Sequence, residues 1–165
     1  MCIMSASKLD RLDARILLAL DVNPDASALA LSRSLGVARN TIHARIARLE
    51  ASGALGSFTR RLRGAAMGYS LTALVSISVM QTKSHLVEAG IFTIPEVVEV
   101  HATTGDADLV AKVLAKDTTD LHRINTEILR LEGIQRTSTV ISVLEVMPTR
   151  MQALLERMAG EDNPV

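Results

Sequence analysis

The spacing of apolar residues changes once along this 165-residue chain, and that change limits the folds that it can adopt. Up to about residue 53, apolar side chains recur every three or four positions, which is typical of amphipathic helices. After Gly68 every second residue is apolar over 71–79, which predicts a long β-strand. We therefore expect a helical front part followed by a domain with both strands and helices.

The charge is also divided between these two parts. Residues 1–63 carry ten Lys/Arg against five Asp/Glu, whereas residues 64–165 carry eight against thirteen. The formal net charge of zero therefore combines +5 in front with −5 behind. A basic front part is typical of a segment that meets a polyanion.

The front part divides into three predicted helices. Asp10 can cap the first, and the sequence Asn23-Pro24-Asp25 ends it. Ser27 can cap a second, short helix that ends at Gly36. The third helix is expected from Arg39 to Ser52. Two helices joined by so short a glycine turn predict a helix-turn-helix.

The third predicted helix has a polar and cationic face opposite its apolar stripe. This face carries Asn40, Thr41, His43, Ala44, Ala47 and Arg48, with Arg39 and Arg45 beside it. An α-helix fits the major groove of DNA, where Asn pairs with adenine, Arg with guanine, and small Ala side chains allow close approach. The alternative is the ordinary solvent-exposed face of a surface helix.

A cationic segment follows the third helix. Residues 58–63 are prone to form a strand and include Arg60, Arg61 and Arg63. Cations beside a recognition helix can bind the DNA backbone, so this segment is interpreted as a wing. The alternative is a solvated edge without a partner.

The second part is predicted to have the order β-α-β-β-α-β. After the strand at 71–80 we expect a helix over 84–90 capped by Ser84 and then a strand from Pro95 to Val100. A turn at 105–108 leads to a strand over 109–114. A helix from Asp117 to Gly133 and a strand over 137–146 complete the unit. This order defines an α+β, ferredoxin-like unit with both helices on one face of an antiparallel sheet. We expect the other face to pack against a second subunit, which gives a two-fold dimer.

The two chain ends carry fewer signals. Residues 149–158 have helical spacing, and we expect this segment to dock on the chain's own body or on a neighbour. The only cysteine is Cys2, no signal peptide is apparent, and the uncharged stretch from Gly64 to Thr82 alternates as a strand does. These features predict a cytoplasmic protein with no membrane span.

Catalysis and metal binding have little support in the sequence. His43, His85, His101 and His122 fall on four separate predicted elements, and no nucleophile has a base beside it. No spacing typical of zinc ligands and no phosphate-binding glycine loop is present, so no cofactor is expected. Because the chain has only three aromatic residues, duplex DNA is a better partner than a stacked single strand.

The motifs resemble one known family. The segment Leu9-Asp10-Arg11-Leu12-Asp13, followed by LSRSLGVARNTIHARIARLEASGAL, is similar to the winged helix-turn-helix of Lrp/AsnC (feast/famine) transcriptional regulators. The resemblance extends to Pro148 and implies three segments: a DNA-binding domain over 1–63, an effector-binding and oligomerisation domain (RAM type) over 64–147, and a C-terminal helix and tail over 148–165. It also implies homodimers that assemble into octamers or similar discs.

Two positions depart from the family's pattern. Ala38 stands where a Ser normally caps the recognition helix, and Ala30 stands where a Glu normally follows Ser27 by three residues. Each missing cap costs roughly 1 kcal/mol of helix stability. We expect this to affect DNA affinity and base preference but not the mode of binding.

The family resemblance also implies an effector site. In the family a small effector, often an amino acid, sits between subunits near the turn that joins the second and third strands. Carried over, this implies the residues Thr103, Thr104, Gly105, Asp106, Asp108, Thr137, Ser138 and Thr139. A carboxylate can pair with an ammonium group and hydroxyls can bind a carboxylate. The alternative is an ordinary hairpin turn and strand edge.

These observations together predict a non-enzymatic transcriptional regulator that binds double-stranded DNA and responds to a small effector. Two alternatives remain open. One is an effector-independent protein that coats DNA as part of nucleoid architecture. The other is an effector-binding or enzymatic subunit whose front helices serve only assembly.

Overall fold

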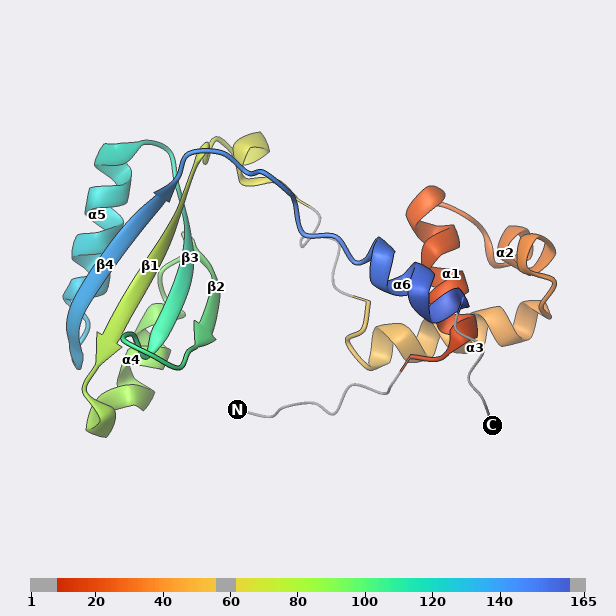
Figure 1. Cartoon of the computed structure of the whole chain (residues 1–165), viewed down its shortest axis with the longest axis horizontal. Coiled ribbons are helices and arrows are strands. Elements are labelled where there is room, and N and C mark those ends of the chain that lie inside the picture. Colours follow the sequence, from red (N-terminus) through yellow and green to blue (C-terminus); the bar gives the residue numbers. More distant parts are fainter. Residues whose placement is uncertain (1–8, 56–61, 161–165) are drawn as a thin grey trace. The chain divides into compact units, whose positions relative to one another are not determined.

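The computed structural model describes residues 9–55 and 62–160, which form two compact units. The helical unit holds residues 9–55 together with 147–160, and the sheet unit holds residues 62–146. Figure 1 shows the elements of each unit. Among the described residues, no helix has the length and apolar character needed to span a membrane.

The helical unit contains the three helices expected from the apolar spacing. These are α1 (Arg11–Val22), α2 (Ala28–Leu35) and α3 (Arg39–Ala51). The side chains of Ile16, Leu31 and Ile42, one from each helix, are buried in its core. The short connection between α2 and α3 makes these two helices a helix-turn-helix.

The predicted caps of the first two helices are confirmed. Asp10 accepts a hydrogen bond from the backbone N–H of Asp13, and the Asp13 carboxylate accepts one from the N–H of Asp10, which completes a capping box. Ser27 caps α2, and Gly36 ends it with a φ of 68°, a backbone conformation that favours glycine. Ala38 precedes α3 without a side-chain cap.

A fourth helix of the helical unit comes from the far end of the chain. Helix α6 (Gln152–Gly160) lies against α1, and the Arg11 Nε donates a hydrogen bond of 2.8 Å to the backbone carbonyl of Ala159. Its half-buried residues Leu155, Met158 and Ala159 share one face of the helix. The C-terminal helix is thus part of the helical unit.

The sheet unit has four antiparallel strands and two main helices. In chain order these are β1 (Leu71–Val79), α4 (Ser84–Ile91), β2 (Val97–Ala102), β3 (Leu109–Ala115), α5 (Thr118–Leu129) and β4 (Ile134–Ser142), with short 3₁₀ turns at Gly64–Met67 (η2) and Gln81–Lys83 (η3). The strand order is β2-β3-β1-β4, and both helices cover one face. This confirms the ferredoxin-like arrangement predicted from the element order.

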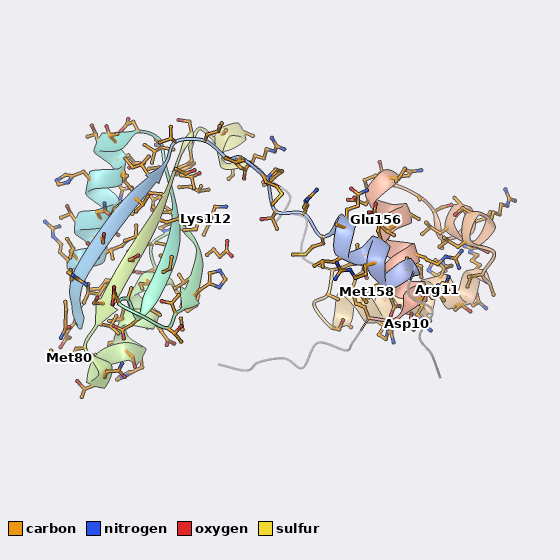
Figure 2. The ribbon with its side chains drawn as sticks, in the orientation of Figure 1. Asp10, Arg11, Met80, Lys112, Glu156 and Met158 are labelled. Carbon is orange, nitrogen blue, oxygen red and sulfur yellow. The ribbon has the colours of Figure 1, made fainter. Side chains whose placement is uncertain are left out.

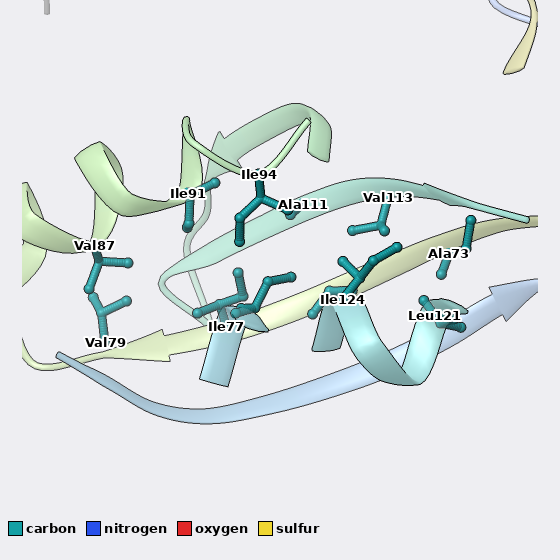
Figure 3. Close-up of a cluster of buried hydrophobic side chains, with 13 residues drawn as sticks. Ala73, Ile77, Val79, Val87, Ile91, Ile94, Ala111, Val113, Leu121 and Ile124 are labelled. Carbon is teal, nitrogen blue, oxygen red and sulfur yellow. The ribbon is translucent and has the colours of Figure 1, made fainter. Parts of the chain in front are cut away.

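The core of the sheet unit lies between that face and the helices. Ala73, Val75, Ile77 and Val79 alternate along β1 and are buried in a cluster with side chains of α4 and α5. Figure 3 labels Ala73, Ile77 and Val79 within this cluster. The opposite face is uncovered within one chain. Leu74 and Val140, paired across β1 and β4 on that face, have relative exposures of 46% and 63%.

Several element boundaries differ from the sequence-based expectation, among them those of β2 and α5, which cover 97–102 and 118–129. Strand β4 covers 134–142 rather than 137–146, because it pairs with β1 and Ser142 lies opposite Thr72 near the start of that strand. Ser84 is the first residue of α4, and no side chain caps that helix. Most of the expected wing, residues 58–61, lies outside the described residues, and Leu62 and Arg63 are not in a strand.

Candidate nucleic-acid interface and effector pocket

Helix α3 presents a continuous exposed face of small and polar side chains. Arg39, Asn40, His43, Ala44 and Ala47 are all exposed. Their spacing of one, three and four residues places most of them along one side of the helix. Thr41, which the sequence placed on the same face, is half-buried.

Two arginines of the predicted interface are engaged inside the helical unit. The Asp13 side chain is fully buried, and it accepts hydrogen bonds from Arg45 Nη1, at 3.1 Å, and from Arg48 Nη2. Arg45 also pairs with Asp10. Because Asp10 and Asp13 belong to the start of α1, these ion pairs join α1 to α3.

The same contacts shift two pKa values. Partial burial opposes ionisation of Asp10, but hydrogen bonds from the Arg45 guanidinium and from the backbone N–H of Asp13 outweigh it and lower the pKa of the Asp10 carboxyl. Hydrogen bonds to Asp10 and Asp13 raise the pKa of Arg45. The Asp10–Arg45 pair is therefore ionised at neutral pH, and Arg45 has its counter-charge within the unit.

Two further residues of the predicted DNA-binding set, Arg60 and Arg61, lie outside the described residues. The described part of the predicted set therefore divides into an exposed group led by Arg39 and Asn40 and a paired group formed by Arg45 and Arg48. Arg48 is paired and also exposed, with 41% of its side chain accessible, so its ion pair with Asp13 lies at the surface of the unit.

The sheet unit carries a small polar pocket of about 260 Å³ on its uncovered face. It is lined by Ser76, Ser78, Asp106, Ala107, Arg136 and Ser138. The strand register brings four of them together, because Ser76 lies opposite Ser138 and Ser78 opposite Arg136. Asp106 and Ala107 enter from the β2–β3 turn, and the Ser78 hydroxyl donates to the Asp106 carbonyl. The pocket thus combines one cation, one anion and several hydroxyls.

Two of the eight residues proposed for the effector site, Asp106 and Ser138, line this pocket. Thr137 and Thr139 lie opposite Ile77 and Val75 and share the helix-covered face, where Thr139 bonds to Asn125. Their separation from Ser138 follows from the two-residue period of a strand.

The remaining members belong to the β2–β3 turn, outside the pocket lining. Asp108 supports the fold, because its carboxylate accepts the N–H of Val79 at 2.8 Å. Thr103 closes the turn through its hydroxyl, which donates to the Ala107 carbonyl at 2.8 Å. Gly105 has a φ of 115°, and Thr104 is exposed.

Sequence reasoning did not single out Ser76, Ser78, Ala107 or Arg136 as binding residues. The alternation of β1 did place Ser76 and Ser78 on the side away from the apolar residues. The alternation within β1 does not give the register between β1 and β4, and it is this register that places Arg136 beside Ser76 and Ser78. That register depends on contacts about sixty residues apart in the chain.

Comparison with known proteins gives a consistent result for both units. Residues 9–50 match the model of the AsnC-type helix-turn-helix domain, and residues 72–152 match that of the Lrp/AsnC ligand binding domain. The HTH-type transcriptional regulator FL11 of Pyrococcus furiosus is 36% identical over 138 residues, which cover 84% of this chain and 91% of that protein. The chain belongs to the Lrp/AsnC family of transcriptional regulators.

Other Lrp/AsnC relatives and structures agree. The HTH-type transcriptional regulator AldR of Mycolicibacterium smegmatis is 34% identical over 131 residues, with 78% of this chain and 77% of that protein covered. The structure of E. coli AsnC has the same fold, with a TM-score of 0.79 at 24% identity, and the match covers 88% of this chain and 99% of that one. The relatives are named transcriptional regulators, so this Lrp/AsnC chain is a DNA-binding regulator and not an enzyme.

Proposed function

We propose that this Lrp/AsnC regulator reads duplex DNA with the exposed face of α3, in the cytoplasm. The observation that carries the proposal is that Arg39, Asn40 and His43 are exposed on the second helix of the helix-turn-helix, beside small side chains. Asn and Arg side chains can bond to base edges, and small residues let the helix approach the groove closely. Arg45 and Arg48 are assigned mainly to holding α3 against α1.

The affinity for genomic duplexes that the wild-type protein selects, measured at several salt concentrations, tests this proposal. Arg39→Ala is expected to reduce the slope of log affinity against log salt by about one, as loss of one phosphate contact does. Asn40→Ala is expected to weaken discrimination at one base position by about 1 to 3 kcal/mol. Arg130→Ala, an exposed cation at the end of α5, is the matched control. Wild-type behaviour of both α3 variants would exclude this face as the interface.

We further propose that the effector is an α-amino acid bound in the sheet-face pocket. Arg136 and Asp106 supply opposite charges suited to the carboxylate and ammonium groups of a zwitterion, and Ser76, Ser78 and Ser138 supply hydroxyls. A transcriptional regulator from Neisseria meningitidis with the same fold, at a TM-score of 0.75 and 22% identity, was solved in complex with L-Met. That match covers 89% of this chain and 99% of that one.

Calorimetry with the L-amino acids tests the effector proposal. We expect at least one to bind the wild-type protein, and Arg136→Gln to abolish that binding. Thr139→Ala changes a hydroxyl on the covered face and is expected to leave binding intact, which also separates the pocket from the wider set implied by the family resemblance. If no amino acid binds the wild-type protein, the effector proposal fails, and the alternative of an effector-independent, architectural DNA-binding protein is favoured.

We also propose that two copies pair through their uncovered sheet faces and that the dimers assemble further. Leu74 and Val140 lie adjacent on that face and are about half exposed in one chain. Val140→Arg places a cation there and is expected to give monomers in sedimentation experiments. Leu129→Arg, on α5 at the opposite face of the sheet, is the control. A dimer that persists in Val140→Arg would exclude this face.

A further inference from the structure

The C-terminal helix α6 lies almost entirely beyond the residues that match the Lrp/AsnC models. The ligand-binding match ends at residue 152, where α6 begins. The helix nevertheless belongs to the same unit as the helix-turn-helix and lies against α1. A segment beyond the family match is therefore part of the DNA-binding unit.

Helix α6 depends on that docking for its own stability. It has only nine residues, and an isolated helix shorter than about 12 to 15 residues is marginal in water. Leu155, Met158 and Ala159 are half-buried on one of its faces, whereas its neighbour Leu154 is 56% exposed. Figure 2 shows Met158 of α6 and Arg11 of α1 in the helical unit. The two helices are also joined by the Arg11 bond to the Ala159 carbonyl.

Helix α1 is shared between α6 and the recognition helix. Arg11 bonds to α6, while its neighbours Asp10 and Asp13 bind Arg45 and Arg48 of α3. All of these contacts lie in the first turn of α1 or at its cap. The carboxylates that bind α3 thus lie in the same turn of α1 that contacts α6.

We propose that α6 positions the recognition helix through α1 and so raises DNA affinity. Docked α6 holds the first turn of α1 in place, and Asp10 and Asp13 there hold the two arginines of α3. A recognition helix that is already ordered loses less freedom on binding DNA. The expected change in DNA affinity rests on the proposed function, whereas the expected ordering of α3 by α6 does not.

The test compares two adjacent leucines of α6. Leu155→Asp puts a charge on the docking face, and Leu154→Asp puts the same charge on the exposed face. In hydrogen exchange on the free protein, Leu155→Asp is expected to make the amides of α3 exchange about tenfold faster, while the strands of the sheet unit stay unchanged. Affinity for a selected genomic duplex is expected to fall by about tenfold in Leu155→Asp, and Leu154→Asp should match the wild-type protein.

One pattern of hydrogen exchange and DNA affinity would overturn the positioning role of α6. If the amides of α6 lose protection in Leu155→Asp while α3 keeps wild-type protection and DNA affinity is unchanged, α6 does not position α3. Should Leu155→Asp unfold the whole helical unit, Leu155→Ala provides the milder variant for the same measurements. If no form of the protein binds duplex DNA but exchange at α3 still rises, the proposed function fails and the positioning role stands.

Discussion

At the scale of single residues, the carboxylate of Asp13 has the most demanding environment in the helical unit. It is fully buried, and both of its oxygens accept hydrogen bonds, from Arg45, from Arg48 and from the backbone N–H of Asp10. A buried carboxylate is stable only with such partners. Charge reversal at Arg48 would remove one partner and add a second negative charge beside it, so Arg48 is a poor probe of DNA contact alone.

Replacement of this carboxylate is expected to lower the stability of the helical unit. Asp13→Asn keeps the shape but removes the charge, leaving two guanidinium groups without their shared partner. Since both guanidinium groups reach solvent, we expect a loss of about 2 to 3 kcal/mol in the free energy of unfolding. Urea denaturation followed by circular dichroism measures it. Asp21→Asn, exposed near the end of α1, is the control, and equal stability of the two variants would contradict the role of Asp13.

At the scale of elements, α3 begins without a side-chain cap, as α4 also does. Its N-cap residue is Ala38, which has no side-chain oxygen to accept an N–H of the first turn, whereas Asp10, Ser27 and Asp117 cap α1, α2 and α5. The backbone at Ala38 has φ −56° and ψ 137°, which is suitable for a capping serine. The recognition helix therefore begins without a contact that serine would supply.

Restoring the cap is expected to stabilise the recognition helix. Ala38→Ser should add about 0.5 to 1 kcal/mol to the free energy of unfolding, because the new hydroxyl can accept an otherwise unpaired N–H. Thermal unfolding measures the gain. Ala38→Val fills the same position without an oxygen and should give no gain. If both variants have the same midpoint, the cap is not the limiting feature.

Helix α5 begins with an acid-sensitive set of contacts. The Asp120 carboxylate accepts the backbone N–H of Lys116 at 3.0 Å and the Nε of Arg123 at 2.9 Å, and these bonds lower the pKa of Asp120. At the other end, the hydrogen bond from Lys83 lowers the pKa of Glu132. A lowered folded-state pKa means that the stabilisation is complete above the unfolded-state pKa, near pH 4, and is lost as the pH falls through the folded-state pKa.

The free energy of unfolding of an Asp120→Asn variant, measured at several pH values, tests this direction of pH dependence. At pH 7 the variant should be less stable than the wild-type protein, and the difference should shrink as the pH falls below the unfolded-state pKa and through the lowered folded-state pKa of Asp120. Chemical denaturation at several pH values gives the difference. Glu88→Gln, exposed on α4, controls for loss of a negative charge. A difference that stays constant from pH 7 to pH 3 would contradict the assignment.

The elements were largely predictable, and the sites were predictable only in part. Helix and strand periods and the caps Asp10 and Ser27 depend on residues close in sequence, so the sequence alone places them. The ion pairs of Asp13 join residues 32 and 35 positions apart, and the pocket depends on the register of β1 with β4. Both arise from packing between elements, which the spacing within one element does not encode. The end of β4 was missed for the same reason, since its partner strand sets it.

At the scale of the whole molecule, the two units have separate cores. The buried cluster around Ile16, Leu31 and Ile42 shares no residue with the one around Val75, Ile77 and Ile124. Each unit can therefore respond to a substitution without the other. This independence allows the effects of variants to be assigned to one unit.

We expect calorimetry to resolve two unfolding transitions. Asp13→Asn should lower the midpoint of one of them only. Gly133→Ala should lower the other, because Gly133 has a φ of 101° and an added Cβ would lie 2.7 Å from the Lys83 Cβ, within the sheet unit. Gly160→Ala, with open space around its Cβ position, is the control. A single transition shifted equally by both variants would show that the units unfold together.

The contribution of α6 to the helical unit also affects how the protein is made. Domains generally fold in order as they leave the ribosome, with the N-terminal domain first. Here the N-terminal unit lacks its fourth helix until residue 160 has been synthesised, after the entire sheet unit has emerged. A nascent chain cut short before α6 would therefore release the first three helices without their last packing partner, so translation must pass residue 160 before this unit is complete.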